Sequence, residues 1–261
     1  MLRALRTAAS GMTAQQLYID IVAHNLANVN TTGFKKSSVD FEDLLYQTIR
    51  PAGPGEGGTQ VPSALQVGHG TKLVASPKVF SQGDTEATGN PLDLQIEGDG
   101  LFQVQLGDGT TGYTRDGSLR IDGEGRLVTA SGLPLMPEIT IPEESGSLLV
   151  TSDGRVYARE AGEDTPTELG QLLLARFINP SGLESVGGNL LRLGASSGDP
   201  IIGAPGELGI GSLQQGALER SNVNVVEEMI KMIVAQRAFE INSKAVQTAE
   251  DLLSMINNLK R

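Results

Sequence analysis

The chain has 261 residues, enough for one large or two modest domains with a hydrophobic core. It contains no cysteine, which excludes disulfides, zinc–thiolate sites and thiol nucleophiles. The net charge of −11 is concentrated in residues 31–221, which carry −12, so a basic surface that tracks nucleic-acid phosphates is not expected.

Apolar residues at alternating spacings of three and four predict one long helix in residues 1–30. Asn28, Asn30 and Gly33 provide the stop signals at its end. The N-terminus has a basic start but lacks the apolar run of a secretory signal, so no cleaved signal is expected. The predicted seam consists of Leu2, Leu5, Ala9, Met12, Gln16, Ile19, Ala23 and Leu26.

Residues 31–81 are predicted to form an extended connecting region that contains a loop at residues 41–63. The first part of this loop, FEDLLYQTI, has apolar residues at near-helical spacing that would suffice for an anchor. Its second part, residues 51–63, is rich in proline and glycine and favours extended chain. Composition alone favours an ordinary surface loop. The alternative is a loop that reaches a neighbouring molecule.

Residues 82–204 are predicted to form an antiparallel β domain, because their apolar period changes to two. Asp-Gly pairs that begin at Asp108, Asp116, Asp122 and Asp153 predict tight turns, since glycine tolerates positive φ. The glycine-rich segment that follows places residues 205–221 in a second extended connection. The predicted strands include Leu92–Ile96, Phe102–Leu106, Leu119–Ile121, Leu127–Thr129, Ile139–Ile141, Leu148–Val150, Val156–Ala158, Leu172–Phe177 and Leu190–Leu193.

Residues 222–261 are predicted to form a second long amphipathic helix. Ser221 and Asn222 are candidate N-caps, and Glu227 and Glu228 suit the positive end of the helix dipole. One apolar stripe follows the predicted helix and consists of Val226, Ile230, Val234, Ala238, Ile241, Ala245, Thr248, Leu252, Met255 and Leu259.

The predicted fold class is therefore α+β, with long N- and C-terminal helices that form a coiled-coil-like domain, an extended connecting region and a β-rich central domain. Two paired helices cannot cover both of their own apolar faces. The helices either form a hairpin within one chain or bury these faces against neighbouring chains, as polymerising coiled coils do. Periodicity leaves both interpretations open.

The residues that imitate chemical sites are better explained by turns. Residues 107–112 match G-x-G-x-x-G, but a strand pattern follows where a dinucleotide site needs a helix. Glu143 and Glu144 imitate the carboxylate pair of a glycan hydrolase, but Pro142 and the following Ser-Gly favour an exposed turn. His24 falls beside the predicted seam, where a packed or solvent-edge histidine is the ordinary interpretation, and His69 has no partner at a known spacing. We therefore expect no catalytic, cofactor or metal site.

Residues 24–36, HNLANVNTTGFKK, resemble the signature of the bacterial flagellar rod and hook family. The resemblance continues in the family's order through residues 113–118, 125–135, 221–225 and 236–247. Within the family, two further segments are similar to distal rod members. They are FEDLLYQTIR at residues 41–50, which a Gly/Pro-rich stretch follows, and residues 170–189, which contain the run INPSGLESVGGN.

The resemblance implies a structural protein rather than an enzyme: a distal rod subunit that polymerises into a rigid, hollow, torque-transmitting shaft around the export channel. It implies a terminal helical assembly domain (residues 1–30 and 222–261) on the inner wall and a β-rich outer domain (residues 82–204). The implied partners are copies of the chain, proximal rod proteins, the hook protein and the surrounding basal-body rings, without nucleic acid, cofactor or membrane insertion. The implied place is the basal body in the periplasm towards the outer membrane, reached by flagellar type III export.

The expected assembly residues lie on the two helices, and the expected rod-type loop residues lie in the segment that follows the first. The assembly set is Leu5, Met12, Gln16, Ile19, Asn25, Leu26, Asn28, Ile230, Val234, Ile241, Ala245, Leu252 and Met255. The loop set is Phe41, Leu44, Leu45, Tyr46 and Ile49. The competing interpretations are a proximal rod paralogue and, in another class, a β domain with oligomerising helices that binds or hydrolyses cell-wall glycan.

Overall fold

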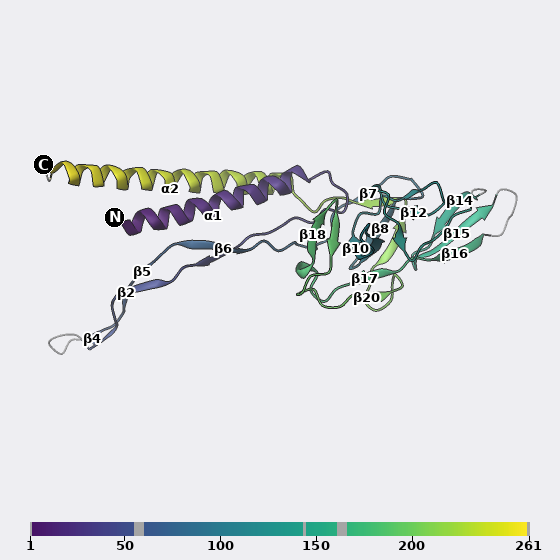
Figure 1. The fold of residues 1–261 in the computed structure, drawn as a ribbon, viewed down its shortest axis with the longest axis horizontal. Helices are drawn as coiled ribbons and strands as arrows, with labels where there is room; N and C mark the ends of the chain where they lie inside the picture. The colour runs from purple at the N-terminus through teal and green to yellow at the C-terminus, as the bar shows by residue number, and fades with distance from the viewer. Residues whose placement is uncertain (1, 55–59, 143–144, 161–165, 260–261) are drawn as a thin grey trace. The chain divides into compact units, whose positions relative to one another are not determined.

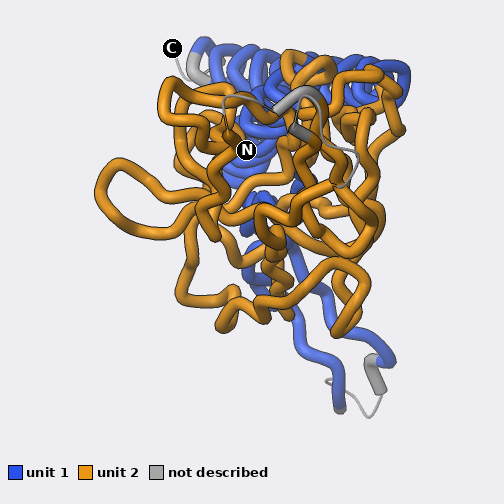
Figure 2. Tube along the Cα trace, turned by 90° about the vertical axis from the view of Figure 1, so that its right-hand side faces the viewer, with its two compact units in different colours: residues 1–26, 37–77, 225–261 blue, residues 27–36, 78–224 orange. Residues whose placement is uncertain are grey.

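The structure is a computed structural model that describes residues 2–54, 60–142, 145–160 and 166–259. The chain divides into two compact units, which Figure 2 colours separately. We call residues 1–26, 37–77 and 225–261 the helix–ribbon unit, and residues 27–36 and 78–224 the β unit. Helices at both ends and strands between them confirm the predicted α+β class.

The helix–ribbon unit contains two long antiparallel helices, α1 (Leu2–Ala27) and α2 (Val225–Leu259), which lie side by side (Figure 1). Near one end of the contact, a Cβ added to Gly11 would lie 2.9 Å from Asn242 Nδ2. Near the other end, Asn25 Nδ2 donates a hydrogen bond of 3.2 Å to Glu228 Oε2. The two helices therefore form a hairpin within one chain, one of the two interpretations that periodicity left open.

A two-stranded antiparallel ribbon completes this unit. Its pairs are β1 (Asp40–Asp43) with β6 (Thr71–Ala75), β2 (Tyr46–Arg50) with β5 (Leu65–Gly68), and β3 (Gly53–Pro54) with β4 (Gln60–Val61). The ribbon contacts α1, where the ring of Phe41 packs edge-on against that of Tyr18 at 5.7 Å. Gly70 has φ +113°, and a Cβ there would lie 2.0 Å from Ser10 Oγ, so this approach requires glycine.

The near-helical spacing at residues 41–49 was misleading, because the segment forms β1, a two-residue link and β2 and contains no helix. Strands β5 and β6 pair with them across the ribbon, and the paired residues lie 15 to 35 positions apart in the sequence. Period alone does not distinguish a short helix from a ribbon whose two faces are both exposed. The part of the predicted loop at residues 55–59 lies outside the described residues.

The β unit is built around a seven-stranded antiparallel sheet in the order β18-β19-β10-β9-β17-β20, with β13 also paired to β9. A three-stranded sheet, β14-β15-β16, and several two-stranded pairs adjoin it in the same unit. A 3-10 helix, η1 (Pro180–Gly182), precedes β18. The strands are β7 (Thr85–Ala87), β8 (Leu94–Glu97), β9 (Leu101–Gln105), β10 (Thr111–Thr114), β11 (Arg120–Ile121), β12 (Leu127–Val128), β13 (Leu135–Met136), β14 (Ser145–Val150), β15 (Arg155–Glu160), β16 (Thr167–Gln171), β17 (Leu174–Arg176), β18 (Glu184–Gly187), β19 (Leu190–Arg192), β20 (Ile201–Gly203), β21 (Ser212–Gln215) and β22 (Ala217–Glu219).

Two hydrophobic clusters hold the β unit together. The larger contains Phe102, Val104 and Leu174, and the smaller contains Leu101 and Ala175. Side chains alternate between the two faces of a strand, so β9 and β17 contribute to one cluster from each face of the sheet. The smaller cluster also includes an edge-to-face contact between Tyr113 and Phe177, with ring centroids 4.8 Å apart.

The predicted turns vary in how they use glycine. The G-x-G-x-x-G segment is the β9–β10 hairpin connection, with Gly109 at φ +79°, which agrees with the turn interpretation. Gly117 is required for a different reason: a Cβ there would lie 1.7 Å from the Leu94 carbonyl oxygen, so two backbones meet. Of the predicted strands, Ile139–Ile141 is buried at both ends but forms only an isolated bridge through Thr140.

The segment at residues 205–221 differs from the expected extended connection. β21 pairs with β8, and β22 pairs with β7, so much of this segment belongs to the sheets of the β unit. Glycine and proline around short strands conceal them, because strands of three or four residues carry little periodic signal. The start of the second helix also differs from the prediction, because α2 begins at Val225, three residues after the candidate N-cap Asn222.

Candidate assembly interface

The apolar stripe predicted on α2 remains exposed in the single chain. Ile230, Val234 and Ile241 are 57%, 60% and 67% exposed. Leu252 and Met255 are also exposed, and so is Ala245. Isolated exposed apolar residues are ordinary on a protein surface, but a continuous patch of this kind marks an interaction site.

A different line of α2 is the one buried within the chain. Glu228, Ala235 and Ala249 are almost fully buried. Ala235 and Ala249 lie one position after the stripe members Val234 and Thr248, which turns them about 100° around the helix. Glu228 lies seven residues before Ala235 and so on nearly the same line. The intramolecular contact therefore uses small and polar residues, and it leaves the apolar stripe uncovered.

An offset of one position also occurs on α1, in the opposite direction along the sequence. The buried residues Ala8, Val22 and Asn25 each precede a member of the predicted seam by one position. Of the expected assembly residues on α1, Gln16 is exposed, and Leu5, Met12, Ile19 and Leu26 are partly exposed. The seam read from the sequence is therefore largely separate from the face buried within this chain.

Asn25 was expected at the interface between subunits, but the structure buries it inside the helix–ribbon unit. Its Nδ2 donates to the Ser37 carbonyl at 2.9 Å, and its Oδ1 accepts from the Ser37 N–H at 3.0 Å. A buried amide has to satisfy its donors and acceptors, and here it fixes the start of the ribbon to α1. Asn28 is partly buried and accepts a hydrogen bond from Thr31 Oγ1 at 3.1 Å.

The expected loop residues lie on the ribbon and are mostly exposed. Leu45 is 85% exposed, and Tyr46 and Ile49 are more than half exposed. Phe41 contacts Tyr18 yet remains 44% exposed, and Leu44 is partly buried. The ribbon is thus a second uncovered apolar surface in the helix–ribbon unit.

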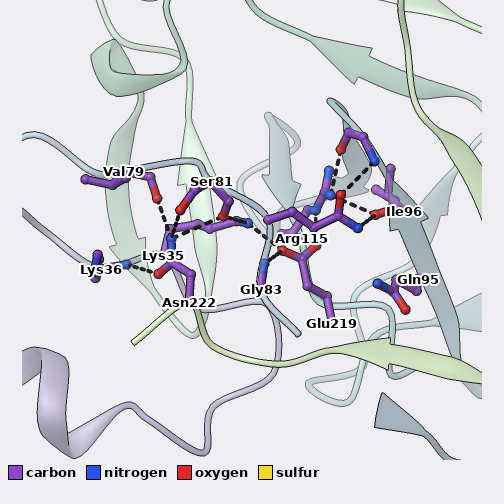
Figure 3. Close-up of polar contacts among 12 residues, drawn as sticks. Lys35, Lys36, Val79, Ser81, Gly83, Gln95, Ile96, Arg115, Glu219 and Asn222 are labelled. Carbon is purple, nitrogen blue, oxygen red and sulfur yellow. Dashed lines mark hydrogen bonds and ion pairs between the residues drawn. The ribbon is translucent and has the colours of Figure 1, made fainter. Parts of the chain in front are cut away.

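Sequence reasoning missed a buried ionic network in the β unit (Figure 3). The Glu219 carboxylate accepts from Lys35 Nζ through Oε1 and from Arg115 Nε through Oε2, each at 2.5 Å. All three side chains are at most 7% exposed. Arg115 also donates to three backbone carbonyls, those of Ile96, Gly98 and Gly100. Burial lowers the pKa of Lys35, and the charge of Glu219 opposes that effect.

The network joins the two segments that adjoin the terminal helices in sequence. The Gly33 N–H donates to the Glu219 carbonyl at 2.8 Å, and the Lys36 N–H donates to Asn222 Oδ1 at 2.8 Å. Asn222 Nδ2 donates in turn to the Val79 carbonyl at 2.8 Å. Asn222 therefore clamps three segments of the β unit instead of capping α2. Lys35, Arg115 and Glu219 are too far apart in sequence for any local pattern to predict that they form one network.

Acid is expected to destabilise the β unit through Glu219. Burial by itself raises the pKa of this carboxyl, but Arg115 and Lys35 outweigh burial and hold the pKa below its ordinary value of 4.5. Because the folded-state pKa is the lower one, the stability contributed by the carboxylate is present above about pH 4.5 and is lost as pH falls through the folded-state pKa. We expect the free energy of unfolding, measured with denaturant, to fall less steeply with acid in Glu219→Gln than in wild type. Equal slopes would contradict this role.

The described residues contain no group of three histidine, aspartate or glutamate side chains placed to hold a metal ion. Glu143 and Glu144, the imitated hydrolase pair, lie outside the described residues. Within the described part of the chain, neither helix is apolar enough over its length to cross a membrane.

Three family models match the chain. They are "Flagella basal body rod protein" at residues 5–35, "Flagellar hook protein FlgE/F/G D1 domain" at residues 95–158, and "Flagellar basal body rod FlgEFG protein C-terminal" at residues 214–259. A flagellar basal-body rod protein FlgG from Borreliella burgdorferi is 52% identical over 264 residues, which cover all of both chains. The FlgG proteins of Buchnera aphidicola subsp. Schizaphis graminum and Caulobacter vibrioides are 46% and 42% identical, over 99% of this chain and 100% of theirs.

The chain belongs to the FlgG family of flagellar basal-body rod proteins.

Membership in the FlgG family confirms the resemblance drawn from the motifs, including its distal rod type. FlgG-family chains are structural subunits of the rod, and the predicted structural function is confirmed. The competing interpretation as a glycan-directed β domain is not favoured.

Proposed function

We propose that the chain polymerises with copies of itself through the exposed stripe of α2 and the partly exposed seam of α1, in a coiled-coil-like arrangement. The continuous apolar stripe that the hairpin leaves uncovered carries this proposal. Burying such a surface on neighbouring subunits supplies the hydrophobic stabilisation that the single chain lacks. The interface residues are Leu5, Met12, Gln16, Ile19, Leu26, Ile230, Val234, Ile241, Ala245, Leu252 and Met255.

In the proposed polymer, residues 1–30 and 222–261 form the assembly domain, and residues 82–204 form the outer domain. Residues 31–81 and 205–221 connect them, although β21 and β22 are also paired within the β unit. The acidic middle of the chain supports an outer, solvated position, and the near-neutral ends support burial between subunits. The helices would then line a hollow, rigid shaft that transmits torque and continues the export channel.

The proposed neighbours are copies of the chain, the proximal rod proteins, the hook protein and the surrounding basal-body rings. The proposed place is the part of the basal body that crosses the periplasm towards the outer membrane, reached through the flagellar type III apparatus. Labelling the chain and imaging isolated basal bodies tests this placement. A label confined to the rod next to the hook is expected, and a label next to the inner membrane would favour the proximal rod alternative.

We further propose that the ribbon is the rod-type loop and that it stiffens the polymer by contacting an adjacent subunit. Its exposed apolar side chains support a docking role: Tyr46 and Ile49 lie on β2, Leu65 and Val67 lie on the paired strand β5, and Leu45 directly precedes β2. A bridging ribbon opposes sliding between subunits, because sliding would expose these side chains to water.

Shortening the ribbon is expected to give filaments that bend. The structure suggests removing residues 46–68 and closing the remaining β1–β6 pair with an Asn-Gly turn, because the Leu44 N–H already donates to the Gly70 carbonyl at 2.8 Å. The β unit should fold and the chain should still assemble. Filament curvature, measured by electron microscopy, should increase clearly relative to wild type. Straight filaments of unchanged bending stiffness would rule out this role.

A further inference from the structure

A cavity of about 160 Å³ lies on the β unit next to the ionic network. Arg115 and Lys35 contribute to its lining, and so does Arg176 at the end of β17. Phe80 and Phe177 contribute aromatic rings to the lining. On the β8–β9 side the cavity is lined by Gly98, Asp99 and Gly100. The cavity therefore combines aromatic side chains with three cationic groups and the carboxylate of Asp99.

Two N–H donors on this lining have capacity to spare. The ammonium group of Lys35 carries three donors, and the described residues give it two acceptors, the Ser81 carbonyl at 2.7 Å and Glu219 at 2.5 Å. Arg176 Nε is buried, and among the described residues it has no hydrogen-bond acceptor. The carboxylate oxygen Asp99 Oδ2 lies 3.8 Å from Arg176 Nε, which is beyond hydrogen-bond range. Buried donors of this kind favour a ligand that accepts hydrogen bonds.

The charges of the cavity and the network are also unbalanced. Lys35, Arg115 and Arg176 are cationic, whereas Glu219 and Asp99 are the carboxylates that pair with them. One positive charge is therefore left over, inside a segment whose net charge is −12. Because an uncompensated charge in a buried site is costly, the cavity favours an anion.

We propose that this cavity receives the carboxylate of an aspartate or glutamate side chain from a second copy of the chain, with Lys35 Nζ and Arg176 Nε donating to its two oxygens. A carboxylate matches both the single excess charge and the two donors. The inference rests on the proposed polymer, in which copies of this chain pack against one another.

A second copy fits the cavity better than a free anion for two reasons. The partner surface is acidic, since residues 31–221 carry −12, and is therefore complementary to the local positive charge. In addition, Ile178 lines the cavity and is 83% exposed, so the cation-lined recess has an apolar rim that a protein surface would cover.

Substitution of Arg176 tests the contact without disturbing the buried network. In the purified full-length chain, Arg176→Gln is expected to raise the critical concentration for assembly about tenfold, since a charged hydrogen bond between subunits is lost. Arg176→Lys should restore part of that loss. Arg192→Gln is the matched control. Arg192 is a similarly exposed arginine of the same sheet, it pairs with Glu184 at 3.1 Å, and neither residue belongs to the cavity lining.

A second measurement examines the cavity below the critical concentration. Acetate is titrated into the isotopically labelled full-length chain, and shifts of the amide signals of residues 98–101 and of Phe177 are expected in wild type and absent in Arg176→Gln. Absence of these shifts in wild type would overturn the carboxylate site. Acetate binding together with normal assembly of Arg176→Gln would overturn the second copy as the occupant and leave the proposed polymer intact. Failure of wild type to assemble would instead refute the proposed polymer, and with it this occupant.

Discussion

Replacing Ile241 with glutamate is expected to abolish polymerisation while leaving the single chain folded. Ile241 is 67% exposed in the single chain, so its replacement should change the monomer's free energy of unfolding by less than about 0.5 kcal/mol. In the polymer the same position would bury an unpaired carboxylate, which costs on the order of several kcal/mol. Each 1.4 kcal/mol is about tenfold in an equilibrium constant, so the critical concentration should rise by roughly 100-fold or more.

The matched control for this substitution is Gln236→Glu. Gln236 is exposed on the same helix, and five residues' separation places it about 140° around α2 from Ile241. The Gln236→Glu substitution adds the same charge outside the stripe, so sedimentation should show that this variant assembles nearly as well as wild type. Equal assembly of both variants would show that the stripe is not the contact surface. Unfolding of the β unit by Ile241→Glu would show that the stripe supports the single chain instead.

Replacing Glu219 with glutamine is expected to destabilise the β unit by about 3–5 kcal/mol, because two buried cations then lose the carboxylate that they share. The comparison variant is Glu184→Gln, which breaks the exposed pair of Glu184 with Arg192 and should cost no more than about 1 kcal/mol. Unfolding curves in denaturant measure both. A loss at Glu219 as small as that at Glu184 would contradict a structural role for the network.

A double-substitution cycle separates the network from general damage at this site. Lys35→Met removes one cation, so the Glu219→Gln change should cost less in that background than in wild type. The difference between the two costs is the coupling energy of Lys35 with Glu219. Strict additivity of the two substitutions would mean that their contact contributes nothing beyond each side chain's own packing.

The terminal helices show which features apolar periodicity predicts and which it does not. Spacings of three and four placed Ile230, Val234 and Ile241 on one stripe, and the structure has them on one exposed line. Periodicity did not show that the helices meet along another line, where Asn25 contacts Glu228, because neighbouring positions differ by about 100° around a helix. Which line faces inward depends on where the partner helix lies.

By itself, the sequence determined the α+β order of elements, the long terminal helices, the Asp-Gly hairpin at Asp108 and the family. These features rest on local spacing, on turn chemistry and on motifs, all of which lie within short stretches of chain. The tertiary structure alone decided the pairing of strands within residues 40–54 with strands within residues 60–75, the inward turn of Asn25 and the ion pairs of Glu219. Those contacts join groups that are far apart in sequence or on different elements, and hydrogen-bond satisfaction and charge burial select them only after the chain has folded.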